Sequence, residues 1–193
     1  IAYLIGKALF YGQGAGANEP LGLALAVVAG QITGANNDNP NGGAANLGDF
    51  DRLAQLVTVR SGRGVNLVMN REAFQKWKAL WYAAGVEPAV RVDPATGREW
   101  YWHGDARVLV SQHLLNDETK GTGTNLTSVY AVVIDTEVGF YGVFKTACPG
   151  KFAILEELAK EGVDQRVVRI AANVGFIVTS EKCVARLNGM QAV

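Results

Sequence analysis

The sequence lacks an excess of charge of either sign, because its 18 lysine and arginine residues balance 18 aspartate and glutamate residues in a chain of 193. Such a chain has no overall field that would draw it to nucleic acid or to an anionic membrane, so any contact with nucleic acid would have to be local. A long apolar run is also missing, since LGLALAVVAGQI is too short and too interrupted by glycine to span a bilayer, and we recognise no signal peptide before it. We therefore expect a soluble, intracellular protein without a membrane partner.

Cysteine and histidine, which dominate many metal sites, are scarce. The two cysteines, Cys148 and Cys183, form no C-x-x-C motif and show no metal-ligand spacing, so we expect two buried thiols in a reducing compartment. We interpret the two histidines, His103 and His113, as surface or structural residues. The sequence therefore predicts no metal site.

Recognisable catalytic motifs are absent as well. Ser111, His113 and Asp117 lie close together in the sequence, whereas a hydrolase triad is assembled from separate elements and its serine needs a turn such as G-x-S-x-G. Cys148 precedes Pro149 without a local base to activate it, so we interpret it as a packed side chain. We expect a protein that is not an enzyme, with no catalytic or cofactor-binding residues and no cofactor.

Glycine is abundant in YGQGAGANEPLGL, residues 11–23, which raises the question of a phosphate-binding loop. A dinucleotide loop follows a strand and opens a helix, but these glycines follow residues 1–10, where the apolar spacing predicts a helix. We interpret Gly12 as the helix stop, and Gly14 and Gly16 as turn residues. A small-ligand-binding enzyme that uses the loop 11–18 is kept as the alternative from a different class.

The sequence does contain 49% hydrophobic residues, enough for a substantial core, and its order of elements predicts an α+β protein. Asp49 is the expected N-cap of a helix of about three turns. Asn70 is expected to cap a second helix that ends at Gly85. The apolar positions predicted for these helices are Phe50, Leu53, Leu56 and Val57 in the first, and the core stripe Phe74, Trp77, Trp81 and Ala84 in the second.

Short strands are predicted in the middle of the chain at 65–70, 99–104 and 106–114, with Trp100 and Trp102 on one face. DPATG, residues 93–97, should be a turn. We expect loops over 32–48 and 116–128, because both stretches are polar and rich in residues that favour turns.

Later in the chain, residues 128–145 are expected to form a strand pair or one long bent strand. ILEELAKEG, residues 154–162, should present its glutamates to solvent from a strand end and a short helix or turn. Strict alternation over 163–180 predicts a single very long strand. A strand of that length suits a building block better than a pocket.

Several stretches, in this order, resemble the major capsid protein of tailed phages, which has the Hong Kong 97 fold. FYGQGAGANEPLGL resembles the end of that family's spine helix and the loop after it, and VNLVMNREAFQKWKALW resembles a strand–Asn–helix segment of its axial domain, with Arg71 where many members have proline. WHGDARVLVSQHL resembles the step from glycine to strand that follows, without the usual proline. The strongest resemblance is in the tail, where YGVFK and FAILEELAKEGVDQRVVRIAANVGFIVTSEKCVARLNGM are similar to the long peripheral-domain strand and the last axial-domain strand.

The resemblance implies a Hong Kong 97-like α+β fold in four segments. These are the end of the spine helix with a peripheral-domain loop (1–47), the axial domain (48–145), the long strand of the peripheral domain (146–181) and a return strand to the axial domain (182–193). It also implies a structural subunit that self-assembles, as hexamers and pentamers, into the icosahedral capsid of a tailed bacteriophage or prophage around double-stranded DNA.

The partners implied by the resemblance are further copies of the chain, then scaffold, portal or decoration proteins, and packaged DNA through non-specific contacts. The implied location is the virion, after assembly in the host cytoplasm. Encapsulin nanocompartments share the fold and enclose cargo enzymes, so an encapsulin-type shell protein is the alternative. Because the chain opens with Ile1 in a helical pattern, we expect a longer protein whose N-terminal arm, extended loop and first part of the spine helix lie upstream.

Overall fold

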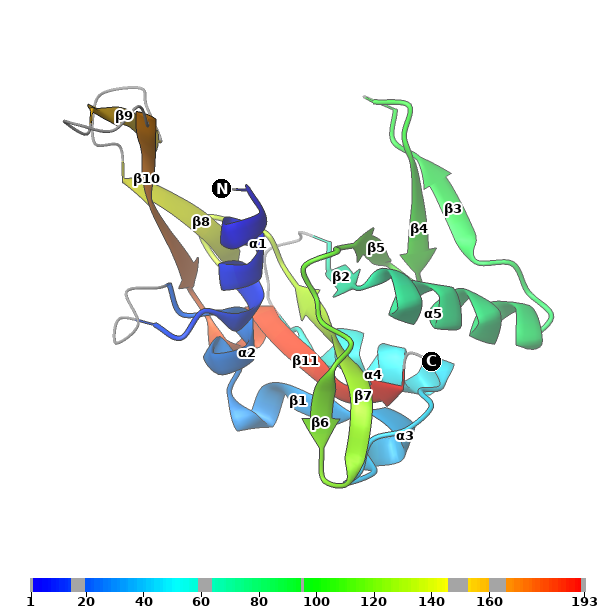
Figure 1. Ribbon diagram of the computed structural model, residues 1–193. Helices are drawn as coiled ribbons and strands as arrows, with labels where there is room; N and C mark the ends of the chain where they lie inside the picture. The colour runs from blue at the N-terminus through cyan, green and yellow to red at the C-terminus, as the bar shows by residue number, and fades with distance from the viewer. Residues whose placement is uncertain are drawn as a thin grey trace.

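The computed structural model describes residues 2–14, 20–58, 64–94, 96–145, 153–159 and 166–191. Its strands form two sheets (Figure 1). An eight-stranded sheet has the order β1–β11–β7–β2–β5–β4–β3, with β6 paired to β7, and a three-stranded sheet has the order β8–β10–β9. The mixture of helices and sheets confirms the predicted α+β class.

Most of the helices lie in the first half of the chain, and the strands β3 to β10 follow one another without a described helix between them. The helices are α1 (Ala2–Tyr11), α2 (Leu23–Ala26), η2 (Ala29–Gln31), α3 (Ala35–Asp38), α4 (Leu47–Leu56), α5 (Arg71–Ala83) and η3 (Glu181–Cys183), where η marks a 3-10 turn. The strands are β1 (Ile32–Gly34), β2 (Asn66–Met69), β3 (Ala89–Val92), β4 (Glu99–His103), β5 (Ala106–Val110), β6 (Glu118–Lys120), β7 (Gly123–Val132), β8 (Phe140–Lys145), β9 (Ala153–Ala159), β10 (Arg166–Val178) and β11 (Val184–Gln191).

The large sheet is mixed, because β1 runs parallel to β11 and β2 runs parallel to β5, whereas the other pairs are antiparallel. Side chains alternate between its two faces. We call the face that carries Leu67 and His103 the α5 face, and the face that carries Tyr130 and Trp102 the α1 face, after the helices that pack on them.

The α5 face is the main core of the protein. Trp77 of α5 and Phe50 of α4 are completely buried there, beside Leu67 of β2. The Asn70 side chain accepts a hydrogen bond from the N–H of Ala73 at 2.7 Å, which confirms the predicted cap of α5. Gly85, with φ of 75°, follows the end of the helix as expected. Ala84, however, is exposed and not part of the core stripe.

The start of α4 differs from the prediction. Asn46, and not Asp49, is the N-cap, because its side chain accepts a hydrogen bond from the Asp49 N–H at 3.0 Å. Asp49 is the third helical residue, and its carboxylate accepts a bond from the Asn46 N–H at 2.9 Å, which completes a capping box. Asp49 is fully buried, so its role is to satisfy backbone donors inside the fold.

The predicted loop 32–48 was wrong over much of its length. It begins with β1, which pairs with β11, and both Thr33 and Ala35 are buried. The following turn, α3, has positive φ angles at three successive residues, Asn36, Asn37 and Asp38. Asn and Asp tolerate this left-handed conformation better than other non-glycine residues, so the polar composition that suggested a loop instead encodes a compact turn with exposed side chains.

The predicted loop 116–128 was also wrong. These residues contain β6 and the first half of β7, which form a hairpin in the large sheet. Thr127 and Ser128 are completely buried. The Asn70 amide donates to Thr127 Oγ1 at 3.0 Å, and that hydroxyl donates to the Leu115 carbonyl at 2.7 Å. Polar residues can be buried here because distant partners satisfy them.

The glycine segment after α1 reverses the chain direction, as predicted. α1 ends at Tyr11, and the Gly12 N–H still donates to the Ala8 carbonyl at 3.0 Å. Gly14 has a φ of 85°, which favours glycine. A Cβ atom at Gly12 would collide with the Pro20 carbonyl, so the returning chain packs directly on this turn. Gly16 lies outside the described residues.

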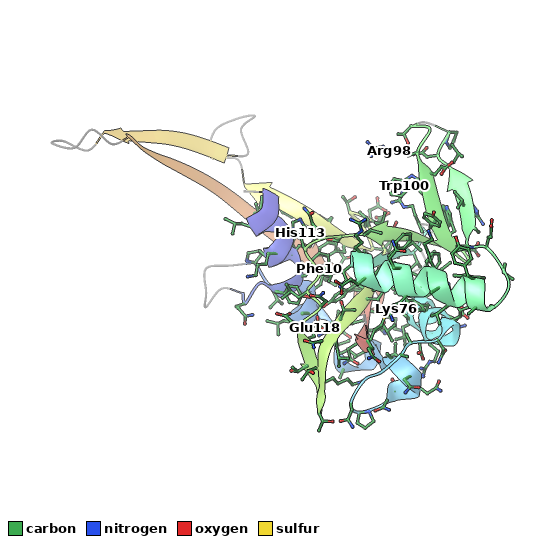
Figure 2. The ribbon with its side chains drawn as sticks, turned by 45° about the vertical axis from the view of Figure 1, so that its right-hand side comes forward. Phe10, Lys76, Arg98, Trp100, His113 and Glu118 are labelled. Atoms are coloured by element: carbon green, nitrogen blue, oxygen red, sulfur yellow. The ribbon has the colours of Figure 1, made fainter. Side chains whose placement is uncertain are left out.

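The three-stranded sheet is built around β10, a strand of 13 residues, which confirms the prediction of one very long strand. Its first seven residues pair with β9 and its last six pair with β8. Over 154–162, where a strand end and a short helix or turn were expected, residues 154–159 belong to the seven-residue strand β9, and 160–162 lie outside the described residues. Figures 1 and 2 show that β9 and the paired part of β10 extend away from the rest of the protein.

The other predicted strands are present in the large sheet. The strands expected at 65–70, 99–104 and 106–114 correspond to β2, β4 and β5, and residues 93–97 include the turn between β3 and β4. The sequence analysis missed β3. Residues 128–145 form two strands, β7 and β8, which belong to different sheets.

Candidate functional site

A groove of about 560 Å³ lies on the α1 face of the large sheet, beside the β3–β4 hairpin. Its lining comes from strands and connecting segments, without a helical residue. The lining residues are Gly64, Val65, Asn66, Arg91, Val92, Asp93, Pro94, Trp100, Trp102, Arg107 and Ile134. We call this the Arg–Trp groove.

Alternation along the strands brings the aromatic and cationic side chains of the groove together. Trp100 and Trp102 share one face of β4, as the sequence predicted, while Arg91 and Arg107 lie opposite them on the neighbouring strands. The Arg91 guanidinium lies 4.5 Å from the Trp102 ring centre, and that of Arg107 lies 5.0 Å from the Trp100 ring centre. Both distances fit cation–π stacking.

The guanidinium of Arg107 is also held from the side. Its Nε donates to the Asn66 side-chain oxygen at 3.0 Å, so stacking and hydrogen bonding together fix its orientation. The indole N–H groups of Trp100 and Trp102 are buried and have no acceptor among the described residues. The accessible donors of the groove are the guanidinium groups of Arg91 and Arg107, so a group that offers acceptor oxygens would complement it.

A second polar cluster joins α1 to the same face of the sheet. Glu118 accepts hydrogen bonds from the Tyr11 hydroxyl at 3.1 Å, from Ser128 Oγ at 2.5 Å and from the Arg186 guanidinium at 3.0 Å. The Tyr11 hydroxyl in turn accepts a bond from the Leu115 N–H at 2.9 Å. Burial and the nearby Glu118 carboxylate raise the pKa of Tyr11 above its usual range. This cluster fixes α1 rather than offering a reactive group.

Apolar contacts complete the attachment of α1. Phe10 is buried, and its ring centre lies 5.7 Å from that of Tyr130 in β7. The His113 ring lies so close to Gly6 that a Cβ atom there would collide with it. Figure 2 shows Phe10, His113 and Glu118 together near α1, whereas Trp100 and Arg98 lie apart on the β3–β4 hairpin.

The residues weighed as catalytic candidates show no catalytic arrangement. Ser111 and His113 lie in the turn after β5, where the backbone N–H of His113, and not its ring, donates to Ser111 Oγ at 3.3 Å. No hydrogen bond joins Asp117 to either residue within the described part of the chain. Cys183 is a buried free thiol whose pKa is raised by burial. Cys148 and residues 15–18 of the loop 11–18 lie outside the described residues.

His103 has a structural role, as expected. It is buried on the α5 face, where Trp77 Nε1 donates to its Nδ1 at 3.2 Å and its Nε2 lies 2.9 Å from an Asp51 oxygen. Burial lowers the pKa of the imidazole. Among the described residues, no three His, Cys, Asp or Glu side chains lie together in a way that could hold a metal ion. Nor does any described helix have the length and apolar character that a membrane span requires.

The architecture defines the class of fold: a sheet-based body with a long projecting ribbon and a helix fixed beside it, the arrangement of Hong Kong 97-like capsid and shell proteins. No protein-family model and no curated protein sequence matches the chain. Solved structures do. The holo-SrpI encapsulin complex of Synechococcus elongatus is similar over 90% of this chain, with a TM-score of 0.72 and 17% sequence identity.

Two capsid structures are similar over 98% of this chain. They are the capsids of an empty and of a native GTA particle, with TM-scores of 0.60 and 0.54 and identities of 14% and 13%. The chain spans 57% of the encapsulin chain and 62% and 61% of the two capsid chains. At these identities the likeness establishes the Hong Kong 97-like fold, which confirms the fold that the sequence motifs implied.

Proposed function

We propose that this protein is a structural subunit that assembles with copies of itself into a closed shell. The observation that carries the proposal is the match of 90% or more of the chain to subunits of an encapsulin and of two particle capsids. A fold alone does not define a function, so properties of this chain have to support the same conclusion.

The projecting ribbon supports it. Beyond the part of β10 that pairs with β8, β9 is the one strand among the described residues that accompanies β10 in its sheet. A ribbon of two strands is marginally stable in water on its own. Contacts with neighbouring subunits would stabilise this ribbon in a shell. The balanced charge of the chain supports assembly too, because it imposes no net repulsion between copies.

The pairing of strands suggests how the expected domains divide. We propose that the eight-stranded sheet, with α3, α4 and α5, forms the axial domain, and that the three-stranded sheet with α1 forms the peripheral domain. On this view β1 joins the axial domain and β8 joins the peripheral domain, since they pair with β11 and β10. These assignments move each of the sequence-based boundaries at 47 and 145 toward the N-terminus by one strand.

The contents of the shell define two versions of the proposal. In the first, the subunits form a tailed-phage or prophage capsid around double-stranded DNA, assembled in the host cytoplasm with scaffold, portal or decoration proteins. In the second, they form an encapsulin-type compartment that encloses protein cargo. The second version is favoured by the higher TM-score to the encapsulin, 0.72 against 0.60 and 0.54. Neither version needs an active site in the subunit.

Expression of the complete coding sequence, followed by size-exclusion chromatography and negative-stain electron microscopy, tests the proposal. We expect closed particles of uniform size. Nuclease-protected DNA in purified particles would identify the capsid, and a co-purifying protein released only on disassembly would identify the compartment. Protein that stays monomeric under all assembly conditions, or calorimetric titration that shows stoichiometric nucleotide binding, would count against a purely structural role.

A further inference from the structure

The α1 face of the large sheet is covered at one end and open at the other. At the covered end, Phe10 packs on Tyr130 and Tyr11 bonds to Glu118. At the other end, the Arg–Trp groove is lined by no helical residue, although it contains two tryptophans. Large aromatic side chains on a surface of this kind are typical of contact sites for other macromolecules.

The rim of the groove is apolar and includes a free sheet edge. Val92 is 60% exposed and Ile134 is 53% exposed, and both line the groove. β3 is the last strand of the large sheet, so its outer backbone groups have no strand partner among the described residues. Such an edge can accept a segment of another chain.

The charges in the groove argue against nucleic acid as its occupant. Among the described residues, the lining contains two arginines and one aspartate, and no lysine. Nucleic-acid sites gain affinity from many phosphate contacts. Tryptophan and arginine in an apolar rim are instead the composition of the energetic centre of a protein interface.

The donors of the groove indicate which groups the partner must offer. The planar Arg91 and Arg107 guanidinium groups are stacked, and so oriented, for bidentate contact with a carboxylate. The chain itself presents a carboxylate close to the exposed groove residue Ile134. Glu137 is exposed in the turn that follows Ile134.

We infer that the Arg–Trp groove is the docking surface for a second copy of this chain, which inserts a carboxylate and an adjoining apolar side chain between Arg91 and Arg107. The inference rests on the proposed shell function and names one of its contacts between copies. It gives a role to an open groove in which two arginine side chains are held in place, in a protein whose overall charge is zero.

Photo-crosslinking of assembled particles tests this contact directly. A benzophenone amino acid is placed at Val92, and particles are assembled from an equal mixture of unlabelled and nitrogen-15-labelled protein. Mass spectrometry should then find crosslinked peptide pairs with one light and one heavy member, which only two copies can produce. The matched control is the same label at Tyr82, a 54%-exposed residue of α5, where we expect far fewer mixed pairs.

Charge reversal tests the chemistry of the contact. Arg91→Glu should lower the yield of mixed crosslinks and of particles roughly tenfold, because it places a carboxylate against the incoming one. Arg98→Glu, an equal charge change on the same hairpin but outside the groove, should stay close to wild type. Arg91→Lys should fall between them, since lysine keeps the charge but loses the planar fork. Circular dichroism melts of all three confirm that each variant is folded.

The outcomes separate this inference from the function on which it rests. Particles that form normally but give crosslinks from Val92 only within one chain, to nucleic acid or to another protein would overturn the docking inference alone. Equal assembly of Arg91→Glu and Arg98→Glu would do the same. A wild-type protein that never assembles would overturn both.

Discussion

The same three strands, β3, β4 and β5, present two different surfaces. On the α5 face, Tyr101 and His103 pack against Trp77, which is completely buried. On the α1 face, Trp100 and Trp102 are only half-buried, and arginines rather than helices cover their rings. Tryptophan therefore has two roles in one small region: it fills the core on one face and shapes a contact surface on the other.

The comparison shows that the role of a tryptophan in this protein depends on the residues that surround it and not on the residue type. Trp77 donates its N–H to His103, so its polar group is satisfied within the core. The indole N–H groups of Trp100 and Trp102 have no acceptor among the described residues. Variants on the two faces should accordingly affect different properties, and their expected effects can be ranked.

The largest effect is expected at the centre of the α5 face. Trp77→Ala should lower the free energy of unfolding by about 3–5 kcal/mol, because it leaves a large cavity among Phe74, Trp81 and Tyr101. Urea denaturation followed by circular dichroism measures this loss. A loss below about 1 kcal/mol would mean that Trp77 is not core and would remove the contrast between the two faces.

Asp49 offers the next largest effect on the same side of the protein. Its carboxylate accepts hydrogen bonds from the N–H groups of Asn36 and Asn46 at 3.0 and 2.9 Å and pairs with Arg52 at 2.5 Å. Asp49→Ala should cost about 2–4 kcal/mol, because two part-buried backbone donors and the Arg52 guanidinium lose their acceptor. Asp105→Ala, in an exposed turn, should change the stability by less than about 0.5 kcal/mol. Similar losses in both variants, measured by denaturation, would contradict the assigned role of Asp49.

A variant at Trp100 should affect assembly more than stability. Trp100→Ala removes a half-buried ring, so we expect a stability loss of about 1.5 kcal/mol or less, well below that of Trp77→Ala. Its effect on assembly should be the larger one, measured as particle yield by size-exclusion chromatography. A normal particle yield together with a loss of stability as large as that of Trp77→Ala would show that Trp100 is a core residue and contradict the proposed difference between the two faces.

The smallest expected effect is on the pH dependence of stability, through His103. The neutral His103 ring accepts from Trp77 at Nδ1, so protonation there would break that bond. Burial lowers the His103 pKa, so below about pH 6.5 the unfolded state binds this proton more readily than the folded state, and stability falls as the pH falls. Urea midpoints at pH 8 and pH 5 should differ more in wild type than in His103→Gln. An equal pH dependence in both proteins would show that His103 does not contribute.

Elements with strong local signals could be predicted from the sequence. Asn70, the apolar stripe of α5 and the alternation along β10 each fix an element through neighbouring residues, and all three are present in the structure. The order of such motifs also resembled the Hong Kong 97 fold, which the structural matches confirm.

Elements defined by distant partners could not be predicted. β1 pairs with β11, more than 150 residues further along the chain, and its own sequence of Ile32, Thr33 and Gly34 carries no alternation. Ser128 can be buried because Glu118 and Arg186 satisfy its hydroxyl. The Arg–Trp groove was missed for the same reason. Trp100 and Trp102 were placed on one face, but β3, which supplies Arg91, was not recognised as a strand.

The length of the strand β10 sets the distance between the two ends of the three-stranded sheet. β10 has 13 residues, and a strand advances about 3.3 Å per residue, so it spans roughly 40 Å of backbone. β9 and β8 pair with successive parts of it, and β10 is the one described strand that runs through both paired halves of the sheet. Because side chains alternate, removing two residues would shorten its reach by roughly 7 Å and keep every side chain on its own face. Removing one residue would move every side chain of the strand beyond that point to the opposite face of the sheet. Changes in the spacing set by this strand are therefore restricted to steps of two residues.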